Sequence, residues 1–101
     1  MHETGIVRDL VGRLQQAARD AGAVRVRGVS VWLGALSQFS PEHFREHFDD
    51  EARGTLAERA TLHIVASDDI SDRHAQHVVL QSVDLEVPDL PQSVAGDAST
   101  T

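Results

Sequence analysis

The chain has 101 residues, a length that suits one domain with a modest hydrophobic core. Its formal net charge is −7, from 16 acidic against 9 basic residues, so a nucleic-acid partner is not expected because phosphate binding needs a basic surface. Cysteine is absent, which excludes disulfides, thiolate zinc sites and a cysteine nucleophile, and no apolar run is long enough for a membrane helix.

Residues 3–21 are predicted to form the first helix. From Val7 to Ala21 apolar residues recur at spacings of three and four, and charged or amide side chains cover much of the opposite face. Gly22 follows the last periodic residue, as is common where a helix ends. The segment has neither the charged start nor the apolar core of a signal peptide, so we expect a cytoplasmic protein.

Residues 24–33 are predicted to form a strand with a break in its pattern. Its apolar residues alternate in one phase up to Val26 and in the other phase from Val29, so Gly28 indicates a bulge or local twist. Trp32 falls on the face opposite the second apolar set. There it either contacts a partner or is covered by a neighbouring side chain.

Residues 40–42, Ser-Pro-Glu, are typical of a helix start. They supply a capping hydroxyl, a proline at the first helical position and an acid in the first turn. The predicted helix extends to about Arg53. Phe44 and Phe48 lie one turn apart and are expected to face the core.

Two further strands are predicted, over residues 61–66 and 77–87, with a polar loop at residues 67–76 between them. The pattern of the last strand changes phase near Gln81 and Ser82. The fold class is therefore α+β: a three-stranded sheet with two amphipathic helices packed on one face, in the order α-β-α-β-β.

The domain organisation follows from composition. Residues 1–87 are expected to form a single domain. From Pro88 the chain is rich in Pro, Ser, Thr, Gly and Asp, and residues 88–101 are predicted to be a disordered C-terminal tail.

The first three residues, Met1, His2 and Glu3, form a candidate metal chelate. A free α-amine on Met1, the backbone nitrogen of His2 and the His2 imidazole can close two fused rings on one ion. Ni(II) and Cu(II), which accept square-planar nitrogen coordination, suit such a site. The motif alone is weak, because many proteins have a histidine near the start by chance.

Several other segments follow this start in a recognisable order. They are residues 29–37 (VSVWLGALS), 40–48 (SPEHFREHF), 54–58 (GTLAE), 62–64 (LHI) and 82–86 (SVDLE). In this order and spacing, together with Met-His-Glu, they resemble the HypA/HybF family of hydrogenase-maturation nickel metallochaperones. The resemblance covers most of residues 1–66 and resumes at about residues 78–87.

The resemblance implies a nickel site at the N-terminus. His2 would be the main side-chain ligand of Ni(II), Met1 and backbone nitrogens would complete the chelate, and Glu3 would supply a backbone nitrogen or local negative charge. It also implies that the metal is handed, with a HypB-type GTPase, to the large subunit of a nickel–iron hydrogenase, and in some organisms to urease.

The chain departs from this family at one place. Family members insert a zinc domain, held by two pairs of cysteines, between the second and third strands, where this chain has only residues 67–76. With no cysteine, no zinc is expected at a cysteine site. His74 and His77, at this loop, could supply a fourth nitrogen to the nickel, or they are solvated loop histidines.

The other histidines carry weaker signals. His43 and His47 have the i, i+4 spacing that can bind a divalent metal, but they are expected to face solvent. His63 lies on the outward phase of its strand and is expected at the surface.

An enzyme is not expected, because no nucleophile or phosphate-loop motif frames the polar residues. The alternative function is a metal-independent interaction module that docks on a hydrogenase subunit or a maturation factor. Trp32 and the acidic surface would then be its working features. The sequence leaves the oligomeric state open, a homo-oligomer included.

Overall fold

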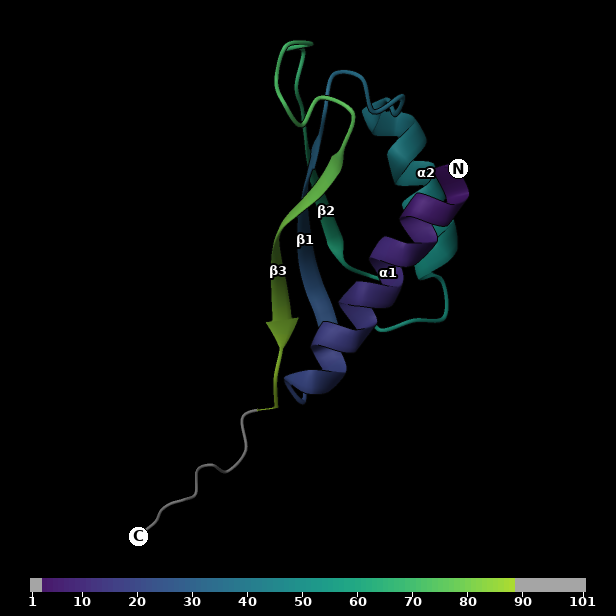
Figure 1. Cartoon of the computed structure of the whole chain (residues 1–101). Coiled ribbons are helices and arrows are strands. Elements are labelled where there is room, and N and C mark those ends of the chain that lie inside the picture. The colour runs from purple at the N-terminus through teal and green to yellow at the C-terminus, as the bar shows by residue number, and fades with distance from the viewer. Residues whose placement is uncertain (1–2, 89–101) are drawn as a thin grey trace, which may run out of the picture.

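Figure 1 shows a computed structural model of the chain, which describes residues 3–88. These residues form helix α1 (Glu3–Asp20), strand β1 (Arg25–Leu33), helix α2 (Pro41–Ala52), strand β2 (Thr61–Ala66) and strand β3 (Val78–Glu86). Both helices lie on one face of the sheet (Figure 1). The α+β class, the element order and the one-sided helix layer predicted from the sequence are confirmed.

Strand β1 is the centre of the sheet, whose strand order is β2-β1-β3. It pairs with β2 in parallel and with β3 in antiparallel orientation. The parallel pair requires a crossover, and α2 provides it. The sequence predicted the three strands but neither their order nor their directions.

The phase change predicted at Gly28 is a bulge. The register between β1 and β3 shifts between Val26 and Gly28, and the extra residue brings Val26 onto the same buried face as Val29. A second shift leaves Gln81 of β3 between the partners of Ser30 and Val31, where the sequence indicated the other phase change.

The hydrophobic core fills the space between the helices and the sheet. Phe44 and Phe48 of α2 are fully buried, as predicted, and their rings stack with centroids 6.5 Å apart. The other large, fully buried side chains come from α1 and β1: Val7, Leu14, Val26, Val29, Val31 and Leu33. Removing a buried phenylalanine side chain typically costs about 3–5 kcal/mol of stability, so these two rings dominate the attachment of α2.

Helix α2 begins with the predicted cap. The Ser40 hydroxyl accepts a hydrogen bond from the backbone N–H of His43 at 3.1 Å, and Pro41 occupies the first helical position. Phe39, just before the cap, packs edge-on against Phe44 with ring centroids 5.2 Å apart. This contact between the residue before the cap and the fourth helical residue is a hydrophobic staple, which fixes the direction in which the chain enters the helix.

The loop at residues 67–76 is attached to the connection that follows β1. The backbone N–H of Gly34 donates to the carbonyl of His77 at 2.9 Å, and that of Leu36 donates to the carbonyl of Ala75 at 2.7 Å. Ala75 is buried, and the backbones approach so closely that a Cβ on Gly34 would lie 2.2 Å from the Ala75 carbonyl oxygen. The end of the loop that carries the two histidines is therefore fixed in place.

Candidate functional site

The predicted N-terminal chelate lies at the edge of the described part of the chain. Glu3 is the first residue of α1, and Met1 and His2 lie outside the described residues, as does the predicted tail from residue 89. Helix α1 is joined to α2 near this end, because the Arg8 guanidinium contacts the Glu51 carboxylate with Nε and Oε1 3.2 Å apart. The element that carries the predicted chelate is thus packed against α2 (Figure 1).

His74 and His77 lie close together. Their Nδ1 atoms are 3.3 Å apart, and both residues are exposed. A tight turn brings them together, in which the backbone N–H of His74 donates to the Asp72 carboxylate at 2.7 Å and that of His77 donates to the His74 carbonyl at 2.9 Å. The loop therefore presents two imidazole nitrogens side by side.

This histidine pair belongs to the sheet face that carries no helix. His74 lines a hollow with Trp32, Val79 and Gln81, which point away from the helices because their neighbours Val31 and Leu80 pack into the core. Helix α1 packs on the opposite face (Figure 1). The proposed fourth nickel ligand from this loop stays a prediction, because Met1 and His2 lie outside the described residues.

His43 and His47 form a second pair, and here the sequence-based expectation of two solvent-facing side chains is wrong. Both residues are half-buried, their Nε2 atoms are 3.1 Å apart and their ring centroids are 4.7 Å apart. The cause is the ring of Phe39, whose centroid lies 5.9 Å from that of His43 and 6.3 Å from that of His47. The signal that could have revealed this contact is an aromatic residue directly before the helix cap.

Trp32 was expected either to contact a partner or to be covered by a neighbouring side chain, and the structure leaves it partly covered. It is half-buried in the hollow that His74 and Asp72 also line. It pairs in register with Val65 of β2 and Val79 of β3, whose side chains are 54% and 38% exposed. These three side chains form an apolar row across the helix-free face, which we call the tryptophan row.

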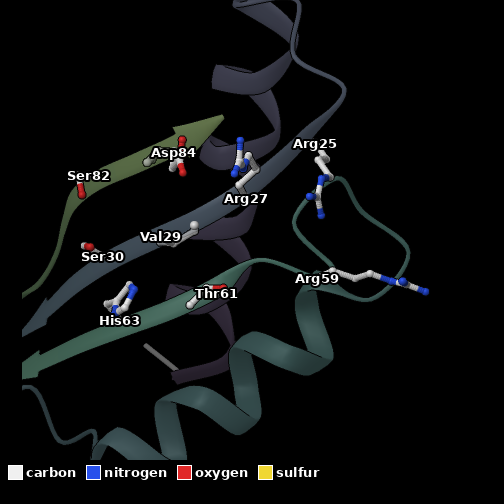
Figure 2. Close-up of a pocket in the computed structure, with 11 residues that line it drawn as sticks. Arg25, Arg27, Val29, Ser30, Arg59, Thr61, His63, Ser82 and Asp84 are labelled. Carbon is white, nitrogen blue, oxygen red and sulfur yellow. The ribbon is translucent and has the colours of Figure 1, made fainter. Parts of the chain in front are cut away.

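A polar hollow of about 470 Å³ lies on the same face, toward the other end of β1 (Figure 2). Three arginines line it: Arg25, Arg27 and Arg59. Sequence reasoning missed this convergence, since Arg59 comes from the turn before β2. His63 and Asp84 also line the hollow, and His63 is exposed, as expected.

The arginines of this hollow are balanced in part by acids. Arg25 donates a hydrogen bond to the carboxylate of Glu86, and this bond together with its charge holds the pKa of Glu86 below its usual range, with Arg27 adding a smaller effect in the same direction. The hollow is therefore polar and mixed in charge.

Within residues 3–88, no group of three or more His, Asp or Glu side chains is placed to hold a metal ion. The two histidine pairs each offer two nitrogens. Neither helix of this part of the chain has the length and apolar character needed to cross a membrane.

A family model described as "Hydrogenase/urease nickel incorporation, metallochaperone, hypA" matches residues 1–71. The hydrogenase maturation factor HypA of Acidithiobacillus ferrooxidans is 38% identical over 65 residues, which cover 64% of this chain and 58% of that protein. HybF of Salmonella typhimurium is 41% identical over 64 residues, covering 63% of this chain and 57% of that protein. The chain thus spans less than two thirds of the length of these relatives.

Two solved structures share the fold. The solution structure of the Ni metallochaperone HypA from Helicobacter pylori has a TM-score of 0.73 at 19% identity, over 87% of this chain and 100% of that chain. A second solution structure of a HypA protein has a TM-score of 0.70 at 19% identity, over 87% and 98% of the two chains. At this identity the likeness concerns the fold alone.

Proposed function

Because this chain belongs to the HypA family, described as nickel incorporation metallochaperones of hydrogenase and urease, we propose that it binds Ni(II) and supplies it to a nickel enzyme during maturation. The observation that carries the proposal is the family match, which starts at residue 1 and so includes Met1, His2 and Glu3. The mechanism is chelation and transfer of a metal ion, with no catalytic step.

The proposed nickel ligands are those of the N-terminal chelate. The α-amine of Met1 and the backbone nitrogen and imidazole of His2 supply nitrogen donors, and Glu3 adds a backbone nitrogen or negative charge. Such nitrogens suit square-planar Ni(II), and they bind only when deprotonated, so affinity falls as the pH is lowered through the usual histidine pKa of about 6.5. The start of α1 at Glu3 supports a chelate on a packed element, because Val7 and Leu10 of this helix are buried in the core.

The finer steps of delivery follow the family. We propose that the nickel passes, with the help of a HypB-type GTPase, to the large subunit of a hydrogenase. Residues 1–87 would form the nickel domain, with the loop at residues 67–76 where relatives carry a zinc domain. The absence of cysteine from the sequence supports a site that works without zinc bound to thiolates.

A calorimetric titration with Ni(II) tests the chelate. Protein with the native start is expected to bind one equivalent of Ni(II). Both His2→Ala and a variant with one extra residue before Met1 should lose that binding, because the first removes the imidazole nitrogen and the second moves the α-amine away from His2. All nine basic residues are arginine, so the sequence contains no lysine and an acylating reagent has the α-amine as its one primary amine. Acylated protein should also fail to bind.

The same titration can refute the chelate, and one more variant tests the fourth nickel ligand. Equal, weak binding by the native, substituted and extended proteins would refute the chelate. A double substitution of His74→Gln and His77→Gln tests the fourth ligand: it should weaken nickel binding only if the loop contributes a nitrogen.

A second candidate function is the metal-independent interaction module. One observation favours it: the tryptophan row of Val65, Trp32 and Val79 is an apolar strip on a sheet face that no helix covers. Partly exposed tryptophans with apolar neighbours are typical of contact surfaces between proteins. The partner would be a hydrogenase subunit or a maturation factor.

A further inference from the structure

We propose that His43 and His47 form a second metal site, on α2, that binds a divalent ion such as Zn(II) through two imidazole nitrogens. This site uses none of the residues of the N-terminal chelate. The two side chains project from the same face of α2, four residues apart, and their Nε2 atoms are 3.1 Å apart.

The spacing of the two nitrogens fits a tetrahedral ion. Zinc binds histidine nitrogens at about 2.0–2.1 Å, and two ligands of a tetrahedron with that radius are about 3.3–3.4 Å apart. The separation of 3.1 Å between the two Nε2 atoms is within a few tenths of an ångström of that value. A metal ion can therefore enter between the rings with small side-chain rotations and no movement of the helix.

Phe39 holds the two rings in this arrangement. Its ring lies against both imidazoles, at centroid distances of 5.9 and 6.3 Å, and it is itself buried and stapled to Phe44. Side chains that are already restricted lose less conformational entropy when they bind a ligand. This distinguishes the pair on α2 from His74 and His77, which are both exposed and lie on a surface turn.

Metal binding at the two Nε2 atoms needs a change of tautomer in one ring and no change in the charge of either ring. At 3.1 Å an Nε2–H of one neutral ring can donate to the Nε2 of the other, and the tautomers decide which ring is the donor. On metal binding the donor imidazole takes its other tautomer, with the proton on Nδ1, and both Nε2 atoms become ligands.

The surroundings favour a cation. Glu42 and Glu46 are exposed neighbours of the two histidines on the same helix, and the whole chain carries a net charge of −7. Two protein ligands leave at least two positions of a tetrahedral ion open. The site therefore suits exchangeable binding, in which water or a donor atom of a partner completes the coordination.

The test uses Zn(II) and a background in which the other candidate sites are removed. This background carries one extra residue before Met1, together with His74→Gln and His77→Gln. Calorimetry is expected to show one equivalent of Zn(II) bound by the background protein. Adding His47→Gln should weaken that binding by more than about tenfold, since even the loss of an outer partner costs a metal site about that much.

A matched control carries the same extra residue before Met1 together with His43→Gln and His47→Gln, but keeps His74 and His77. It should not bind zinc as tightly as the background protein. The substitution of His43 leaves the helix cap intact, because the cap uses the backbone N–H of that residue, and circular dichroism verifies the fold of each variant.

Failure of the background protein to bind zinc would overturn the proposal, and so would binding that His47→Gln leaves unchanged. Because the N-terminal chelate is disabled in the background protein, neither result bears on whether the native start binds nickel. A failed nickel titration with intact zinc binding would in turn refute only the chelate.

Discussion

The Phe39 ring determines the surroundings of both histidines on α2. It precedes the helix cap, contacts Phe44 in the core and covers the two imidazoles from the side. Histidine spacing alone indicated a pair on one helix face, and this ring lies against both members of the half-buried pair. Spacing within a helix can be predicted from sequence, whereas the neighbour that covers it comes from the loop geometry before the cap.

The ion pair of Arg25 with Glu86 gives a prediction at the scale of a single residue. The Arg25 hydrogen bond lowers the pKa of Glu86, so Arg25→Gln should raise that pKa toward the ordinary glutamate value. A carboxyl with a lowered pKa in the folded state contributes stability above its unfolded pKa, and this contribution is lost as the pH falls through the folded value. A carbon-detected NMR titration of Glu86 measures the shift.

The control for this titration is Arg13→Gln, because Arg13 pairs with Asp9 on α1 and not with Glu86. An unchanged pKa of Glu86 in Arg25→Gln would show that the pair makes no contact in solution.

At the scale of elements, the contact of Gly34 with Ala75 holds the loop at residues 67–76 against the end of β1. A Cβ at Gly34 would overlap backbone atoms of Ala75 and His74, which cannot rotate away as a side chain can. We expect Gly34→Ala to lower the free energy of unfolding by about 1–3 kcal/mol, the usual cost of overpacking. Urea denaturation measures this value.

The control is Gly12→Ala in the middle of α1, where a Cβ would meet nothing within 4 Å. Alanine is favoured over glycine in a helix by about 0.8–1.0 kcal/mol, so this variant should be more stable than the original. If both substitutions changed the stability equally, the close approach at Gly34 would not exist in solution.

The sequence predicted those elements that depend on local chemistry. The cap at Ser40, the two buried rings of α2 and the bulge at Gly28 were each visible in a few adjacent residues. The parallel pairing of β1 with β2 and the gathering of Arg59 with Arg25 were not, because they depend on contacts between segments far apart in the chain. The nickel site stays a prediction from the sequence, since Met1 and His2 lie outside the described residues.

The whole molecule has two different faces. One is covered by α1 and α2 (Figure 1). The other carries the polar hollow (Figure 2) and the tryptophan row. The interaction module would use the helix-free face, whereas the predicted chelate uses the residues at the start of α1, which packs on the other face. The two candidate functions therefore use different residues, and separate substitutions can test them.

This separation gives a prediction for the interaction module. If the module is correct, binding to a hydrogenase large subunit or a HypB-type GTPase persists in EDTA and in His2→Ala, and Trp32→Thr weakens it by at least about tenfold, as expected for a tryptophan hot spot. Val24→Thr is the control, since Val24 is 51% exposed but lies outside the tryptophan row. Binding measured by biolayer interferometry that vanishes in EDTA would exclude the module.

The two outer strands of the sheet have a consequence for how such a chain can be altered. Strands β2 and β3 flank β1 on either side, so the ends of the connection between them are about two strand spacings, or roughly 10 Å, apart. Its base is fixed at Gly34, but its tip is solvent-exposed, with Ile70 69% accessible. A whole domain can therefore be inserted or deleted at this tip while the pairing of all three strands is kept.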